Sequence, residues 1–131
     1  MKHFILTLAS SVALTISVNA QTYDKLFYKD IIKEAGDITV TVDNAVSTAG
    51  ETKFKLKITN KTNDYMIYKP TESKFIVNGK ELSPTEKMMV IKPNESNFVT
   101  INLKGSGYNA IKNYSYSLDG LYTISTSGKT I

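Results

Sequence analysis

The sequence predicts an all-β protein, an antiparallel β-sandwich of about seven to nine strands that follows a signal peptide. The first observation is that short stretches of alternating apolar and polar residues recur through residues 37–126, which is the period of half-buried strands. The second is that clusters of Asn, Gly and Pro, which favour turns, separate these stretches. In the clearest stretch, Thr52–Asp64, three apolar residues alternate with three lysines. The predicted core residues there are Phe54, Leu56 and Ile58.

Residues 1–20 are predicted to be the signal peptide. Lys2 gives the segment a positively charged start, and Phe4–Val18 is largely apolar. Val18-Asn19-Ala20 then places residues that are small, or that signal peptidase tolerates, before the cleavage point. An uncleaved membrane anchor is the alternative, but the apolar run is shorter than the roughly 18 to 20 residues needed to span a bilayer. Cleavage between Ala20 and Gln21 predicts an exported protein, periplasmic or secreted, with no membrane insertion after cleavage.

Residues 21–36 are predicted to be a lead-in segment that packs on the edge of the sandwich. The apolar residues of this segment fit one face of a short helix, and they also fit an extended strand. They are Leu26, Phe27, Ile31 and Ile32. Gly36 ends either element, so the sequence leaves both open.

Residues 37–126 are predicted to form the sandwich, and residues 127–131 a short polar tail. The predicted strands cover 38–42, 52–59, 65–68, 75–77, 80–82, 87–91, 97–104, 114–118 and 121–124. Asn78-Gly79 predicts a two-residue type I′ turn, because both central positions of that turn need positive φ. Asp119-Gly120 predicts a second hairpin turn near the C-terminus.

The charge of the predicted mature chain argues against nucleic-acid binding. Removal of residues 1–20 leaves 15 lysines and 12 acidic residues, a formal net charge of +3, and the sequence contains no arginine. The planar guanidinium of arginine is the group that suits paired contacts with phosphates. We therefore interpret Lys53, Lys55 and Lys57 as a solubilising outer face of their strand and predict no nucleic-acid partner.

The residue inventory also excludes several catalytic and metal sites. The only histidine, His3, lies in the predicted signal peptide, and the chain has no cysteine. Ser–His–Asp and Cys–His catalysis need an imidazole, and zinc sites need imidazole or thiolate ligands. Asn60, Asn63 and Asp64 offer oxygen atoms for calcium, but the spaced loop of acidic residues is missing, which favours a plain turn. We predict no catalytic residue, no metal and no cofactor.

Eight tyrosines stand out in the composition, and the sequence has no tryptophan. A tyrosine ring with its polar hydroxyl suits a binding surface, and tyrosine is also a good strand former. Tyr114 and Tyr116 lie two residues apart and therefore share one face of a strand, with Tyr108 nearby in a glycine-flanked loop. These three tyrosines are the candidate binding residues, and sheet packing is the alternative role.

Three segments resemble exported immunoglobulin-like domains of Bacteroidetes-type bacteria. They are Lys53–Pro70 (KFKLKITNKTNDYMIYKP), Phe75–Lys80 (FIVNGK) and Leu118–Tyr122 (LDGLY). The resemblance covers residues 37–126. It implies an immunoglobulin-like β-sandwich of a family whose function is unknown and which supplies no assigned site residue.

The predicted signal peptide, the strand pattern and the missing catalytic residues together indicate a non-enzymatic binding or adhesive module, whose partner is an unknown protein or glycan of the cell envelope. Two alternatives stay open. A carboxylate-dependent glycan hydrolase would use two of the 12 acidic residues, although the sequence does not place a pair at the required separation. A purely structural spacer domain would need no ligand.

Overall fold

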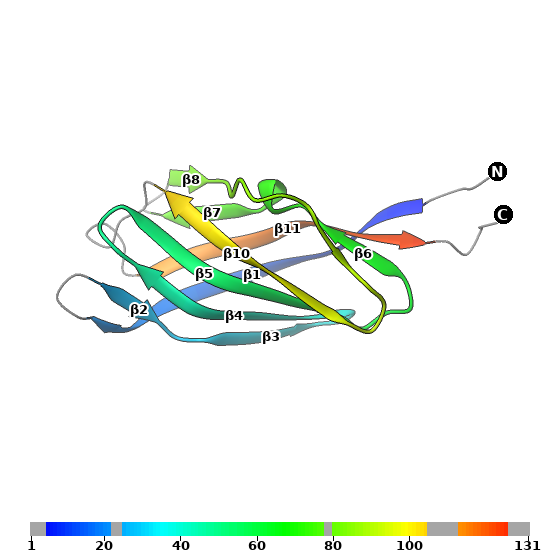
Figure 1. Ribbon diagram of the computed structural model, residues 1–131, viewed down its shortest axis with the longest axis horizontal. Coiled ribbons are helices and arrows are strands. Elements are labelled where there is room, and N and C mark those ends of the chain that lie inside the picture. The colour runs from blue at the N-terminus through cyan, green and yellow to red at the C-terminus, as the bar shows by residue number, and fades with distance from the viewer. Residues whose placement is uncertain (1–4, 22–24, 78–79, 105–112, 126–131) are drawn as a thin grey trace.

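The structure, a computed structural model, describes residues 5–21, 25–77, 80–104 and 113–125. These residues form eleven β-strands and one short 3₁₀ helix, which confirms the predicted all-β fold. In chain order the elements are β1 (Ile5–Gln21), β2 (Leu26–Tyr28), β3 (Ile31–Ala35), β4 (Ile38–Ser47), β5 (Glu51–Asn60), β6 (Tyr65–Tyr68), η1 (Pro70–Glu72), β7 (Lys74–Val77), β8 (Lys80–Leu82), β9 (Met89–Ile91), β10 (Ser96–Lys104) and β11 (Asn113–Ser125). The strands make two antiparallel sheets that lie face to face along the long axis of the molecule (Figure 1).

The two sheets share one strand, β1. In sheet A, β11 pairs with β1 along one edge and with β6 and β7 along the other, while β9 extends β6 and β8 extends β7. Sheet B runs β10–β5–β4, and both β2 and β3 pair with β4. Residues 5–17 of β1 pair with β11 in sheet A, and residues 18–21 pair with β2 in sheet B. β1 therefore ties the sheets together at one side of the sandwich.

The residues predicted to be the signal peptide form most of β1. Val12, Leu14 and Ile16 are buried in the core, whereas Ala13 and Thr15 are exposed, so this part of the strand has one apolar face. In the structure, the described part of the predicted signal peptide thus forms a strand between β11 and β2 (Figure 1). Export and cleavage after Ala20 stay predictions.

The lead-in segment is extended rather than helical in its described part. It forms β2 and β3, and both strands pair antiparallel with β4. Leu26 and Tyr28 are buried, and Phe27 between them is 37% exposed, which is strand periodicity. Of the two possibilities that the sequence left open, the strand is the one observed.

Seven of the predicted strands in residues 37–126 match β4 to β10. β4 is longer than predicted because the chain continues past a bulge between Asp43 and Val46, where Asn44 has a φ of 53°. A left-handed backbone of this kind is tolerated by asparagine. β7 and β8 pair as the predicted hairpin. Its turn residues, Asn78-Gly79, lie outside the described residues.

The predicted hairpin at Asp119-Gly120 is wrong, because β11 continues through these two residues as one strand. Ser10 pairs with Leu121 and Val12 with Leu118, so the two residues of β11 lie opposite the single residue Ser11, which is a β-bulge. Gly120 has a φ of +86°. Its carbonyl accepts a hydrogen bond from the Lys69 N–H at 2.8 Å, which fastens the bulge beside η1.

The core lies between the sheets and is joined by aromatic contacts across them. Phe54, buried as predicted together with its neighbours on β5, packs against two rings of sheet A. Its ring centroid lies 6.2 Å from that of Phe75 and 5.3 Å from that of Tyr116. Such offset and edge-to-face contacts are favourable packing geometries. No helix within the described ranges has the length and apolar character needed to cross a membrane.

Candidate functional site

Tyr116, one of the three predicted binding residues, is fully buried, and the prediction that it lies on a contact surface is wrong. The reason is that β11 has a strand on each edge and turns the Tyr116 face toward sheet B, where the ring meets Phe54 and Phe75. The side chain of Tyr114 and the whole of Tyr108 lie outside what the structure describes. The structure therefore does not bring the three tyrosines together in a site.

The hydroxyl of Tyr116 belongs to a buried polar network. It lies 2.7 Å from the Tyr68 hydroxyl, which lies 2.6 Å from Ser73 Oγ. Ser73 Oγ also donates to the Asp119 carbonyl at 2.9 Å and accepts from the Asp119 N–H at 3.0 Å. Burial raises the pKa of Tyr116 to about 12 and also raises the pKa of Tyr68, because a phenolate would lose its water. The network satisfies buried hydroxyls and serves packing.

Two further tyrosines have local structural partners. The Tyr28 hydroxyl lies 2.8 Å from Ser47 Oγ, which lies 2.6 Å from Thr52 Oγ1 in a second buried group. The Tyr122 hydroxyl donates to Glu72 Oε1 at 2.6 Å, and this hydrogen bond raises the pKa of Tyr122. The tyrosine content is thus mainly a property of the core and its borders in the described part of the chain.

The outer face of sheet B carries the exposed apolar side chains instead. We define this face by three rows of residues that lie directly opposite one another across the strands and so share one side of the sheet. The rows are Phe98–Lys57–Thr41–Ile32, then Thr100–Lys55–Asp43, then Asn102–Lys53–Val46–Phe27. Each row has a lysine of β5 in it, and the first and last rows end in apolar residues.

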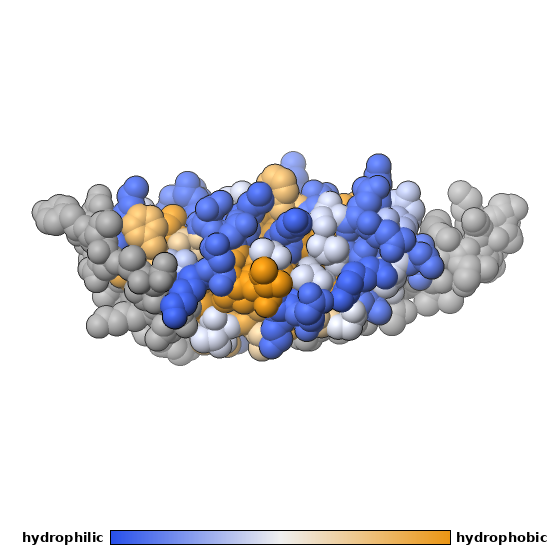
Figure 2. Space-filling model, turned by 90° about the horizontal axis from the view of Figure 1, so that it is seen from below, coloured by the Kyte–Doolittle hydropathy of each residue, from blue (hydrophilic) through white to orange (hydrophobic). Residues whose placement is uncertain are grey.

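The apolar members of the outer face are well exposed. Ile32 is 71% exposed and Phe98 is 54% exposed. Lys55 Nζ lies 4.3 Å from the centroid of the Phe98 ring, a cation–π contact that holds the ring against the strand. Figure 2 looks from below onto the edge of the sandwich bordered by β3 rather than onto the outer face itself, and it shows apolar surface there with hydrophilic side chains around it.

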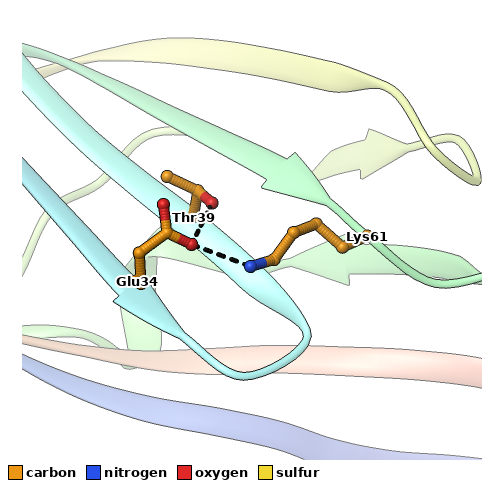
Figure 3. A network of polar contacts seen from close by, with 3 residues as sticks. All are labelled: Glu34, Thr39 and Lys61. Carbon is orange, nitrogen blue, oxygen red and sulfur yellow. Dashed lines mark hydrogen bonds and ion pairs between the residues drawn. The ribbon is translucent and has the colours of Figure 1, made fainter.

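A small polar network closes the outer face at β3. Glu34 Oε1 accepts hydrogen bonds from Lys61 Nζ at 2.8 Å and from Thr39 Oγ1 at 2.9 Å (Figure 3). These bonds, the one from Lys61 first, lower the pKa of Glu34 below its usual value. Because Lys61 neutralises it, Glu34 does not offset the charge of the lysines on β5.

The cluster considered for calcium is a structural turn. Asn60 is fully buried, and its Nδ2 donates to the carbonyl oxygens of Asp64 at 2.7 Å and Ile91 at 3.2 Å. Its Oδ1 accepts from the Thr62 N–H at 2.9 Å and from the Thr62 hydroxyl at 2.7 Å. Both polar atoms of the Asn60 amide therefore form hydrogen bonds that hold the turn together. No group of three or more His, Cys, Asp and Glu side chains in the described residues has the arrangement of a metal site.

A pocket of about 400 Å³ lies beside the end of β10. Glu86 Oε2 accepts a hydrogen bond from the Asn102 N–H at 2.9 Å, while Glu86 Oε1 and Asn102 Oδ1 are buried without a hydrogen-bond partner in the described residues. Two free acceptors suit a ligand with N–H or O–H groups. Glu86 is the one carboxylate among the described residues that line the pocket, and glycosidases use two.

Sequence reasoning missed Phe98, Ile32 and Phe27 as candidate contact residues, although one signal was present. Phe98 occupies the same phase of the alternation as Thr100 and Asn102, on the polar side of its strand. Because that side of the strand faces solvent, an aromatic residue on it is an exposed apolar group.

Comparisons of this chain with protein-family models, with curated proteins and with solved structures found no match. Its function must therefore be argued from its own residues.

Proposed function

We propose that this protein is a non-enzymatic, exported, immunoglobulin-like binding module, periplasmic or secreted, that contacts a protein of the cell envelope through the outer face of sheet B. The observation that carries the proposal is the exposure of Phe98 and Ile32 in one row with Lys57. If this face served only solubility, polar side chains would be expected at both positions. Thr41 of the same row is such a residue.

The chemistry of the outer face favours a protein partner over a glycan. Its large exposed side chains are phenylalanine and isoleucine, whereas the described tyrosines that form hydroxyl networks are buried. Lys53 and Lys57 are exposed beside the apolar residues, and Lys57 has no ion pair among the described residues. The complementary surface presents apolar groups flanked by carboxylates. Its association is expected to weaken with salt, because exposed charges are screened.

The test is affinity capture from envelope extracts with matched variants. Wild-type protein is compared with Ile32→Ser and Phe98→Ser on the outer face, and with Ile76→Ser as the control. Ile76 is 38% exposed and lies on β7 of sheet A, so this variant removes an exposed isoleucine from the other sheet. We expect the control to retain the captured partner, and each outer-face variant to weaken its binding by at least about tenfold in a direct titration.

Two results would contradict the proposal. Equal loss of binding in the control and in the outer-face variants would place the contact elsewhere. Absence of any captured protein, combined with an empty glycan array, would leave the structural spacer. Export is tested separately by the mass of the protein recovered from the periplasm or medium, which should begin at Gln21.

A further inference from the structure

The position of β1 points to a second binding site, at the seam between the two sheets. We propose that removal of the leader converts the slot between β11 and β2 into an acceptor site for an extended strand of another polypeptide, bound antiparallel to β11. This inference rests on the export and cleavage proposed above. It does not depend on the outer face of sheet B.

The predicted cleavage point coincides with the end of the strand. β1 pairs with β11 from Ile5 opposite Ser125 to Ser17 opposite Asn113, and it then pairs with β2 up to Gln21 opposite Leu26. A cut between Ala20 and Gln21 thus separates nearly the whole of β1 from the chain while leaving β2 and β11 in place. Figure 1 shows β1 and β11 side by side along the length of the sandwich.

Loss of β1 opens both the backbone and the core. The opposite edge of β11 is already occupied by β6 and β7, and within the described residues only β1 pairs with the edge that the cut exposes. That edge then presents a row of unpaired N–H and C=O groups, which readily pair with another strand. The positions of Val12, Leu14 and Ile16 in the core become empty at the same time. A mature chain therefore gains both hydrogen bonds and apolar burial by taking up a strand.

β1 itself shows what the slot accepts. Val12, Leu14 and Ile16 are buried, Ala13 and Thr15 between them are exposed, and the whole of Ile5–Gln21 lacks charged residues. The occupant is accordingly an uncharged extended segment with branched aliphatic residues at three alternate positions. Main-chain pairing with a sheet edge supplies affinity in such strand addition, and the alternate side-chain positions supply specificity.

The experiment uses the full chain, produced without export so that β1 is present. A protease recognition sequence is inserted directly after Gln21, and the folded protein is cut there, which leaves β1 held without a covalent bond. A fluorescent peptide with the sequence of residues 5–21 is then added, and its incorporation is followed by gel filtration and fluorescence anisotropy. We expect it to exchange into the slot.

Two peptide variants provide the matched control. Thr15→Asp changes an exposed position, and Leu14→Asp changes the adjacent buried one. We expect the Thr15→Asp peptide to exchange like the unmodified one, and the Leu14→Asp peptide to bind at least about a hundredfold more weakly, because its carboxylate would enter the core. If the cut protein comes apart, the two pieces are refolded together from urea and the same contrast is measured as recovery of strand signal by circular dichroism.

Failure of the unmodified peptide to enter by either route would overturn the proposal, and so would equal binding of the two variants. Export has its own readout, the N-terminal mass of the protein isolated from cells. A chain that keeps its leader in the cell yet exchanges the peptide in vitro would refute the export step and leave the acceptor property of the slot standing.

Discussion

The interior between the sheets and the outer face of sheet B use aromatic residues in opposite ways. In the interior, Tyr116 is fully buried and its hydroxyl is bonded to that of Tyr68. On the outer face, Phe98, which has no polar atom in its side chain, is 54% exposed, and Lys55 Nζ lies over its ring. The more polar aromatic residue is inside and the less polar one outside. The phase of a residue on its strand, rather than its chemical type, decides which aromatic groups are available for contacts.

The largest expected effect contrasts Tyr116→Ala with Phe98→Ala. Truncation of a buried aromatic side chain typically costs about 3–5 kcal/mol, so Tyr116→Ala should lower the free energy of unfolding by that order. Phe98→Ala should change it by less than about 1 kcal/mol, since an exposed ring loses little on truncation. Urea unfolding followed by circular dichroism measures both. If the two variants lost similar amounts of unfolding free energy, the interior and the outer face would not differ as described.

The next effect concerns two glycines with positive φ, one packed and one open. A Cβ at Gly120 would lie 2.5 Å from the Lys69 carbonyl oxygen, whereas a Cβ at Gly36 would meet nothing within 4 Å. Gly36→Ala should cost about 1 kcal/mol from backbone strain alone. Gly120→Ala should cost about 2–3 kcal/mol because a backbone clash is added to the strain. Chemical denaturation of both variants provides the comparison, and equal costs would mean that the bulge relaxes freely.

Alkaline pH should destabilise the interior network. Tyr116 has its pKa raised from 10.0 to about 12 by burial, so between these values the unfolded chain releases a proton that the folded chain keeps. The free energy of unfolding therefore falls as pH rises through this window, and this contribution is intact below pH 10.0.

Tyr116→Phe should reduce this alkaline loss, although Tyr68 still contributes to it. The variant should also cost about 1 kcal/mol at neutral pH, because the Tyr68 hydroxyl loses a buried partner. Urea midpoints at several pH values above neutrality measure the slope. An unchanged slope in the variant would show that Tyr116 does not contribute to the alkaline sensitivity.

The smallest effect belongs to the exposed border of the outer face. The pKa of Glu34 is lowered mainly by the hydrogen bond from Lys61, so Lys61→Met should raise it back toward its usual value. Any stability from this pair is present at neutral pH and is lost as pH falls through the pKa of Glu34. NMR titration of the Glu34 side chain tests the shift, and Lys57→Met serves as a control that should leave it unchanged.

Strand periodicity alone predicted most of the sandwich, because β5 alternates along its whole length between buried and more exposed residues, and β10 does so from Val99 to Lys104. It failed at Asp119-Gly120, where positive φ at a glycine serves a turn and a bulge equally. The pairing of β1 with β11 on both sides of these residues shows that the glycine belongs to a bulge. The sequence did not decide between a contact surface and sheet packing for Tyr116, because alternation along one strand does not show that the Tyr116 face of β11 turns toward sheet B.

The predicted signal peptide illustrates an ambiguity of another kind. An apolar segment with small polar interruptions satisfies the requirements of a signal peptide, and Val12–Ile16 within it also alternates as a strand does. Both interpretations use the same residues; the pairing with β11 and β2 shows the strand and leaves export and cleavage predictions. The apolar composition therefore distinguished the segment from the rest of the chain, but it did not show that the segment forms a strand of the core.

The pairing of the first strand with the last has a consequence for synthesis. Ile5 meets Ser125 and Ser17 meets Asn113, so β1 has no partner in sheet A until almost the entire chain has left the ribosome. At roughly 5–20 residues per second, translation leaves the N-terminal segment unpaired for several seconds or more. Contacts so distant in sequence also form slowly. During that interval the N-terminal segment lacks its partner in sheet A, and the time at which β11 emerges limits when the segment can be buried in the fold.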